Sequence, residues 1–105
     1  MIASSWKTAA KDITYGFRSP ELRKCIAENI DPEYAGKITL IFNETEEQSN
    51  FNITPSFWRK CPEVRGNNIK AYFQQIRQLN WPPYKTYKYE IIYLGGKHFE
   101  VKKKP

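Results

Sequence analysis

The glycine pair Gly95-Gly96 constrains the fold more than any other feature of this sequence, because it joins two segments that both have the character of strands. Adjacent glycines can adopt the positive φ angles that a tight hairpin turn requires. The flanking segments, Lys85 to Leu94 and Lys97 to Lys103, are rich in aromatic and β-branched residues. The sequence therefore predicts a C-terminal β-hairpin with a two-residue turn.

This turn also predicts the pairing of the two strands. Leu94 would face Lys97 and Ile92 would face Phe99, and alternate residues would share a face. One face, expected to be buried, carries Ile92, Leu94, Phe99 and Val101. The other, expected to be a surface, carries Tyr87, Tyr89, Ile91, Tyr93, His98, Glu100 and Lys102.

Two helices are predicted before the first strand. From Ser4 to about Tyr15, apolar residues recur at the period of one helical face, namely Trp6, Ala9, Ala10 and Ile13. A second helix is predicted from Pro20, with Ser19 as its cap, and it ends before Asp31-Pro32 because the residue before proline resists helical geometry.

The middle of the chain predicts a strand pair and a third helix. Residues 37–43 and 50–54 alternate as two strands of a hairpin. Residues 55–66 contain Pro55 and Pro62, which exclude a central strand, so we expect a connection with one helical turn that directs Phe57 or Trp58 inward. Residues 67–79 show the clearest amphipathic helical pattern.

The expected fold class is α+β, with the element order ααββαββ. An antiparallel sheet of about four strands, with two N-terminal helices and one central helix mainly on one of its faces, would bury the apolar sides of all these elements. With 105 residues, the chain is expected to form a single globular domain over 1–105.

Charge is distributed unevenly along the chain, whose formal net charge is +6. Residues 1–54 carry six basic and eight acidic side chains, a net of −2, whereas residues 55–105 carry eleven basic and three acidic side chains, a net of +8. A positive field of this kind attracts nucleic acids or acidic proteins. A solvated surface that keeps the protein in solution would give the same count.

The leading functional hypothesis is a small basic module that binds RNA or single-stranded DNA. Bases stack on aromatic rings, and basic side chains neutralise phosphates. The candidate nucleic-acid-binding residues are Arg59, Lys60, Arg65, Tyr87, Tyr89, Tyr93, His98 and Lys102. The alternative for the tyrosines is that they pack beneath the helices.

Two other function classes stay open. Four large aromatic residues could serve a protein-interaction or self-associating module, with a second copy of the chain as partner: Trp6, Phe57, Trp58 and Trp81. A small ribonuclease-like toxin could use His98, with Glu100 on the same strand face and Tyr93 opposite. No complete catalytic motif is present, so no catalytic residue, metal or cofactor is expected.

The remaining expectations concern location. The N-terminus lacks the basic and apolar regions of a secretory signal, and no apolar run is long enough to span a bilayer. We therefore expect a cytoplasmic protein without a membrane partner. Cys25 and Cys61 are expected to be free thiols.

Overall fold

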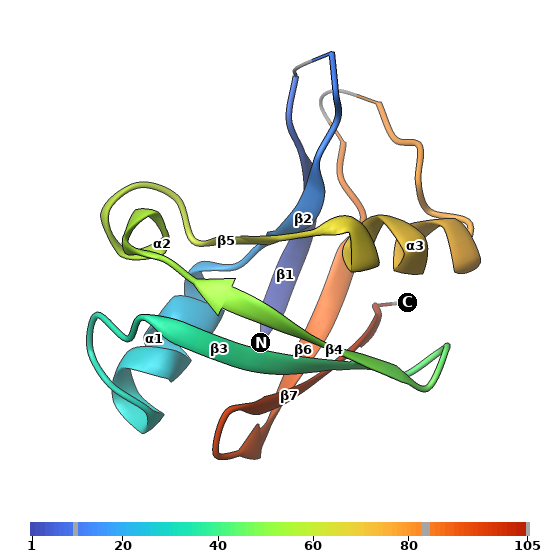
Figure 1. Ribbon diagram of the computed structural model, residues 1–105. Helices are drawn as coiled ribbons and strands as arrows, with labels where there is room; N and C mark the ends of the chain where they lie inside the picture. The colour runs from blue at the N-terminus through green and yellow to red at the C-terminus, as the bar shows by residue number, and fades with distance from the viewer. Residues whose placement is uncertain (10, 83–84, 105) are drawn as a thin grey trace.

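The computed structural model describes residues 1–9, 11–82 and 85–104. Within these ranges, seven strands form one mixed sheet that curls almost into a barrel, with three short helices against it (Figure 1). In chain order the elements are β1 (Ile2–Lys7), β2 (Tyr15–Arg18), α1 (Pro20–Asn29), β3 (Gly36–Phe42), β4 (Glu47–Ile53), α2 (Pro55–Arg59), β5 (Glu63–Arg65), α3 (Asn67–Gln75), β6 (Lys88–Gly95) and β7 (His98–Lys103). The expectation of about four antiparallel strands in the order ααββαββ is therefore wrong.

The strand order in the sheet is β4-β3-β7-β6-β1-β2-β5. Neighbouring strands are antiparallel except β3 and β7, which run parallel with Thr39 opposite His98. The two edge strands, β4 and β5, are not hydrogen-bonded to each other, yet the curl of the sheet brings them close together. A seam between β4 and β5 thus interrupts an otherwise continuous barrel.

The N-terminal segment is a strand pair, and the predicted helix from Ser4 to Tyr15 is wrong. β1 lies between β6 and β2 and pairs with both, with Trp6 opposite Gly16. Its buried residues are the small ones, Ala3 and Ser5, while Ile13 is 46% exposed. Pairing with two neighbours overrides the helical spacing of the apolar residues in this segment. Ala10, part of that pattern, lies outside the described residues.

The helix after Ser19 is confirmed as α1. Ser19 Oγ accepts a hydrogen bond of 3.0 Å from the Leu22 backbone N–H, which caps the helix. The same hydroxyl donates to the Ile2 carbonyl oxygen at 2.7 Å. Ser19 therefore fixes the start of α1 against β1.

In the middle of the chain, the predicted strand pair is confirmed as β3 and β4, with Ile38, Leu40 and Phe42 buried. The expected helical turn is α2, which buries Phe57. The third helix is confirmed but is shorter than predicted, since α3 ends at Gln75. β5 was not predicted, because three residues are too few for a periodic signal.

The C-terminal hairpin is confirmed, but its predicted register is wrong by one residue. Gly95 pairs with His98, and a bulge shifts the register between Tyr93 and Gly95, so that Tyr93 faces Phe99. Both Gly95 (φ 104°) and Gly96 (φ 56°) have the positive φ angles expected of this turn. Because side chains alternate along a strand, the one-residue shift exchanges the faces predicted for β6: Tyr89 and Ile91 are buried, and Leu94 is 51% exposed. The faces predicted for β7 are confirmed, with Phe99 and Val101 buried.

The concave side of the sheet holds a core that is rich in aromatic rings. α3 packs at one end of this side and α1 at the other (Figure 1). Phe17 and Tyr89 meet edge to face at 5.0 Å, and Phe42 stacks on Tyr72 at 4.4 Å between ring centres. No helix in the described ranges has the length and apolar character needed to cross a membrane.

Candidate nucleic-acid interface

The tyrosines that were predicted to form a ligand surface lie on the concave side of the sheet instead. Tyr89 is fully buried, and its hydroxyl donates a hydrogen bond of 2.7 Å to Gln78 Oε1. Burial raises the pKa of the Tyr89 phenol above its ordinary value. The prediction that Tyr89 faces outward is wrong, because the register of the hairpin turns this face inward.

Tyr87 and Tyr93 are half-buried and also pack against the core. The Tyr87 ring lies 6.3 Å from that of Trp81. Tyr93 packs against Phe99 at 5.1 Å and donates its hydroxyl to the Gly96 carbonyl oxygen at 2.9 Å. These contacts show that the rings of Tyr87 and Tyr93 pack against the protein interior and do not form a surface of exposed rings. Lys102 is half-exposed and lies opposite Glu90 in the ladder between β6 and β7.

His98 lies exposed beside the hairpin turn. Tyr93 pairs with Phe99, so it points to the opposite side of the sheet from His98 and Glu100. The constellation of histidine, carboxylate and phenol that the sequence suggested is therefore not brought together. Across the described residues, no three His, Cys, Asp or Glu side chains are grouped as metal ligands.

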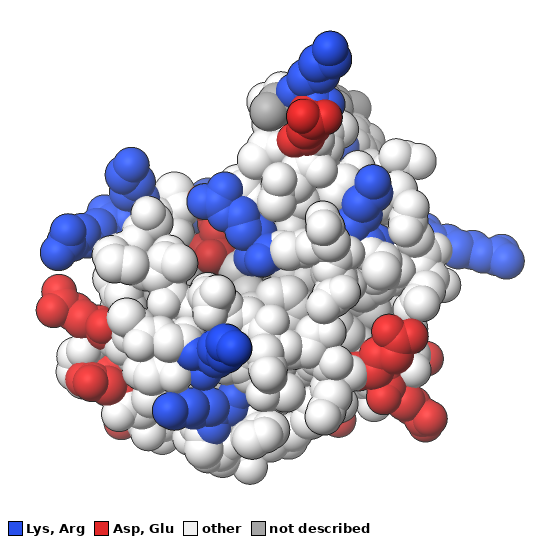
Figure 2. All heavy atoms as spheres, in the orientation of Figure 1, with Lys and Arg blue, Asp and Glu red and all other residues white. Residues whose placement is uncertain are grey.

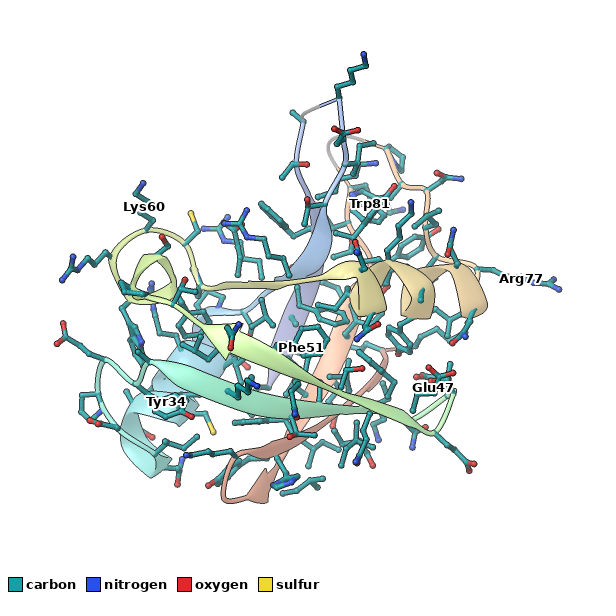
Figure 3. All side chains as sticks on the ribbon, in the orientation of Figure 1. Tyr34, Glu47, Phe51, Lys60, Arg77 and Trp81 are labelled. Atoms are coloured by element: carbon teal, nitrogen blue, oxygen red, sulfur yellow. The ribbon has the colours of Figure 1, made fainter. Side chains whose placement is uncertain are left out.

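The predicted basic connection remains on the surface. Arg59 ends α2, Lys60 follows it, and both are exposed. Figure 3 shows Lys60 projecting from the loop after α2. Arg65 is exposed at the end of β5 and lies beside residues that the sequence had not connected with it.

The residues beside Arg65 lie on the convex face of four adjacent strands, β6, β1, β2 and β5. Ladder pairing places Lys88, Ser4, Arg18 and Glu63 in one row across these strands. The adjoining row contains Trp6, Gly16 and Arg65. We call the set of Trp6, Arg18, Arg65 and Lys88 the convex patch.

Trp6 and Arg65 meet across Gly16, which carries no side chain to separate them. The Arg65 guanidinium carbon lies 5.3 Å from the centre of the Trp6 ring, within the range of a cation–π contact. Only glycine fits between them, since a Cβ at Gly16 would run into the Val64 carbonyl oxygen. The sheet thus holds a guanidinium over one face of an aromatic ring on its surface.

Trp6 differs from the other two tryptophans in its surroundings. Trp81 is half-buried and packs against the core, edge to face with Phe73 at 5.8 Å, with Lys7 Nζ 4.4 Å from its ring centre; Figure 3 labels it near α3. Trp58 packs against the core and donates Nε1–H to the Tyr34 carbonyl oxygen at 2.7 Å. Trp6 is half-exposed and, among the described residues, is not one of those packed against the buried cluster. Core packing therefore does not account for this ring.

The charges of the convex patch are mainly positive. The side chains of Arg18, Arg65 and Lys88 are exposed. The two rows of residues described above contain one carboxylate, that of Glu63, which lies opposite Arg18. The Lys88 ammonium donates to Ser4 Oγ at 2.7 Å. On the face shown in Figure 2, most Lys and Arg side chains are spread over the upper half, from the left side to the far right, while Asp and Glu gather mainly at the lower corners.

Of the eight residues predicted from the sequence, only Arg65 belongs to this patch. Trp6 was missed because helical spacing assigned it to a core face. Alternation in β1 carries the missed signal, since the small residues Ala3 and Ser5 occupy one face while Ile2 and Trp6 lie on the other. Comparisons of the chain with protein-family models, with curated proteins and with solved structures give no match.

Proposed function

We propose that this protein binds single-stranded nucleic acid on the convex patch. The observation that carries the proposal is the half-exposed Trp6 ring, which lies outside the core with the Arg65 guanidinium against it. An aromatic ring beside cations is the arrangement that single-strand binders use, because a base stacks on the ring while its phosphates meet the cations.

The spacing of the patch suits a flexible strand. Neighbouring strands of a sheet lie about 4.8 Å apart, so Arg18 and Lys88, on either side of β1, are about 10 Å apart at their backbones. Trp6 lies two residues along β1 from their row, a rise of about 7 Å. Cations thus flank the ring on two sides, so a base on Trp6 would have its neighbouring phosphates within their reach.

Unpaired rather than duplex nucleic acid is the expected ligand. Bases in a duplex are stacked on one another, and a flat ring on a sheet surface cannot reach between them without unstacking them. Stacking on an aromatic side chain contributes about 1–3 kcal/mol per base in single strands. Trp6 would supply this stacking free energy, and the three cations would supply affinity that depends on salt.

The test is a salt titration of binding to a fluorescent mixed-sequence RNA 12-mer and to the corresponding DNA. Wild-type affinity should fall as salt rises, with a slope of log K against log salt of about −2 for three phosphate contacts. Trp6→Ala should weaken binding about 5- to 150-fold. Arg65→Gln should reduce the magnitude of the slope by about 0.7.

Arg77→Gln is the matched control, because Arg77 is exposed beyond α3, away from the convex patch (Figure 3). It should leave both affinity and slope close to the wild-type values. No binding at low salt, a flat response to salt, or full affinity in Trp6→Ala would each overturn the proposal.

A protein-interaction function has weaker structural support. Among the residues that the structure describes, the exposed large apolar side chains are those of Ile13 and Leu94, at 46% and 51%. They lie near the tips of two hairpins at opposite ends of the molecule, so they form no continuous apolar patch (Figure 1). A mass that rises with protein concentration would favour self-association over nucleic-acid binding.

A further inference from the structure

A polar groove lies at the seam between β4 and the start of α3. Its volume is about 490 Å³, and it is lined by residues from both sides of the seam. Asn50, Asn52 and Thr54 line it from the β4 side, and Arg65, Asn67 and Asn68 line it from the other. The groove exists because the sheet curls without completing the ladder between its two edge strands.

The lining of the groove contains four carboxamides and, among the described residues, one charged side chain, that of Arg65. Two of its four asparagines are tied to neighbours: Asn50 Oδ1 accepts from the Thr39 hydroxyl at 2.7 Å, and Asn68 Nδ2 donates to Ser49 Oγ at 2.9 Å. Among the described residues, the side chains of Asn52 and Asn67 have no hydrogen-bond partner. Each of these two exposed amides offers a donor pair and an acceptor to a ligand.

Phe51 and Gly66 bring the two sides of the seam together. A Cβ built at Gly66 would lie 3.2 Å from Phe51 Cε1, so the backbone at Gly66 packs directly on the buried ring. The contact fixes the two sides of the groove relative to each other. Asn52 and Asn67, each next in the chain to one of these two residues, are therefore held at a defined separation.

Arg65 connects this groove to the convex patch. The same side chain lies over the Trp6 ring and lines the groove, so a strand that stacks on Trp6 would have the groove beside it, across Arg65. We propose that the groove takes an unpaired nucleobase of that strand and reads its hydrogen-bonding edge with Asn52 and Asn67. This inference rests on the proposed nucleic-acid binding and adds base selectivity to it.

A base fits this chemistry better than a phosphate does. Phosphate sites concentrate cations and backbone N–H groups, whereas Arg65 is the one charged residue among those that line the groove. Carboxamides form paired hydrogen bonds with base edges, as asparagine and glutamine do with adenine. Splayed bases of single strands expose these edges, which a duplex hides.

The test compares binding of A8, C8 and U8 RNA to wild type and to Asn52→Ala/Asn67→Ala at one salt concentration. Wild type should prefer one of the three oligomers by about fivefold or more. The double variant should bind all three within about twofold of one another, with an unchanged salt slope, because no phosphate contact is lost. Urea midpoints of the two proteins confirm that both are folded.

Asn43→Ala/Asn80→Ala is the matched control, because both asparagines are exposed and neither lines the groove. It should keep the wild-type preference. Trp6→Ala should lower all three affinities by a similar factor and keep their ratios.

The failure of this inference differs from that of the proposed function. Salt-dependent binding of equal strength to all three oligomers would overturn base reading and leave the convex patch standing. A preference that persists in Asn52→Ala/Asn67→Ala would also overturn base reading. No binding to any oligomer at low salt would overturn both.

Discussion

The hydroxyl of Tyr72 donates a hydrogen bond of 2.5 Å to Glu44 Oε1 and so connects α3 to the end of β3. The other oxygen of the same carboxylate accepts from the Lys103 backbone N–H at 2.7 Å. Tyr72 also stacks on Phe42 in the core. Glu44 therefore joins three segments that are distant in sequence: the β3–β4 turn, α3 and the end of β7.

Tyr72→Phe should lower the free energy of unfolding by about 1.5–3 kcal/mol, because it removes one hydrogen bond to a charged group while the ring still fills its site. Urea unfolding would measure the change. Glu44→Gln serves as the comparison, with a smaller expected loss, because its amide oxygen can accept from the Lys103 N–H while its amide nitrogen donates to the Tyr72 hydroxyl oxygen. A Tyr72→Phe protein as stable as wild type would show that this bond does not stabilise the fold.

Stability should fall at alkaline pH. Burial, followed by the hydrogen bond to Glu44, raises the pKa of Tyr72 above its ordinary value of about 10, and burial also raises that of Tyr89. The unfolded chain then loses these protons at a lower pH than the folded one. Their contribution is complete below about pH 10 and is lost as the pH rises toward the folded-state pKa values.

The measurement is the free energy of unfolding in urea between pH 8 and pH 11. Above pH 10, each buried phenol should contribute a decline of about 1.4 kcal/mol per pH unit. Tyr72→Phe should show a shallower decline than wild type, by about that amount. Parallel curves for the two proteins would contradict the assignment to Tyr72.

Ser19→Ala should destabilise the protein by about 1–2 kcal/mol, because it removes the cap of α1 and the hydrogen bond to the Ile2 carbonyl oxygen. Thr54→Ala is the matched control, since Thr54 stands at the N-cap of α2 but makes no capping hydrogen bond through its side chain. Its urea midpoint should lie close to that of wild type. Equal losses of stability in Ser19→Ala and Thr54→Ala would mean that the hydrogen bonds of the Ser19 hydroxyl do not stabilise the protein.

Gly16→Ala should destabilise the sheet by about 1–3 kcal/mol, because its new methyl group meets the Val64 carbonyl oxygen, a backbone atom that cannot rotate away. It should also weaken nucleic-acid binding by separating Arg65 from Trp6. Gly66→Ala is the comparison, since its methyl group would meet a ring edge of Phe51 that can shift by a few tenths of an ångström. In urea unfolding, Gly16→Ala should have a lower free energy of unfolding than Gly66→Ala. The reverse order would contradict this explanation.

Where the sequence was read correctly, the signal was local. Ser19-Pro20 predicted the start of α1, and the alternation of Ile38, Leu40 and Phe42 predicted the buried face of β3. Each of these signals acts within a few residues, through a cap or a side-chain period. The glycine pair likewise predicted the final hairpin and its positive φ angles.

Where the sequence-based prediction is wrong, the deciding contacts join distant segments. β1 is a strand because it pairs with β2 and β6, and neither pairing is visible in its own apolar spacing. A single bulged residue after Tyr93 exchanged the two faces of β6 and moved its phenols inward, while β7 kept its predicted faces. The convex patch depends on both outcomes, since Trp6 lies on β1 and Lys88 on β6.

By itself the sequence determined the local elements that have their own caps, periods or turn residues, together with the positive charge of the C-terminal half. Only the tertiary structure decided the seven-strand order, the register of the hairpin and the meeting of Trp6 with Arg65 across Gly16. The physical reason is that ladder hydrogen bonds and side-chain alternation give every strand two possible faces. The choice between them is made by its neighbours in the sheet and not by its own residues.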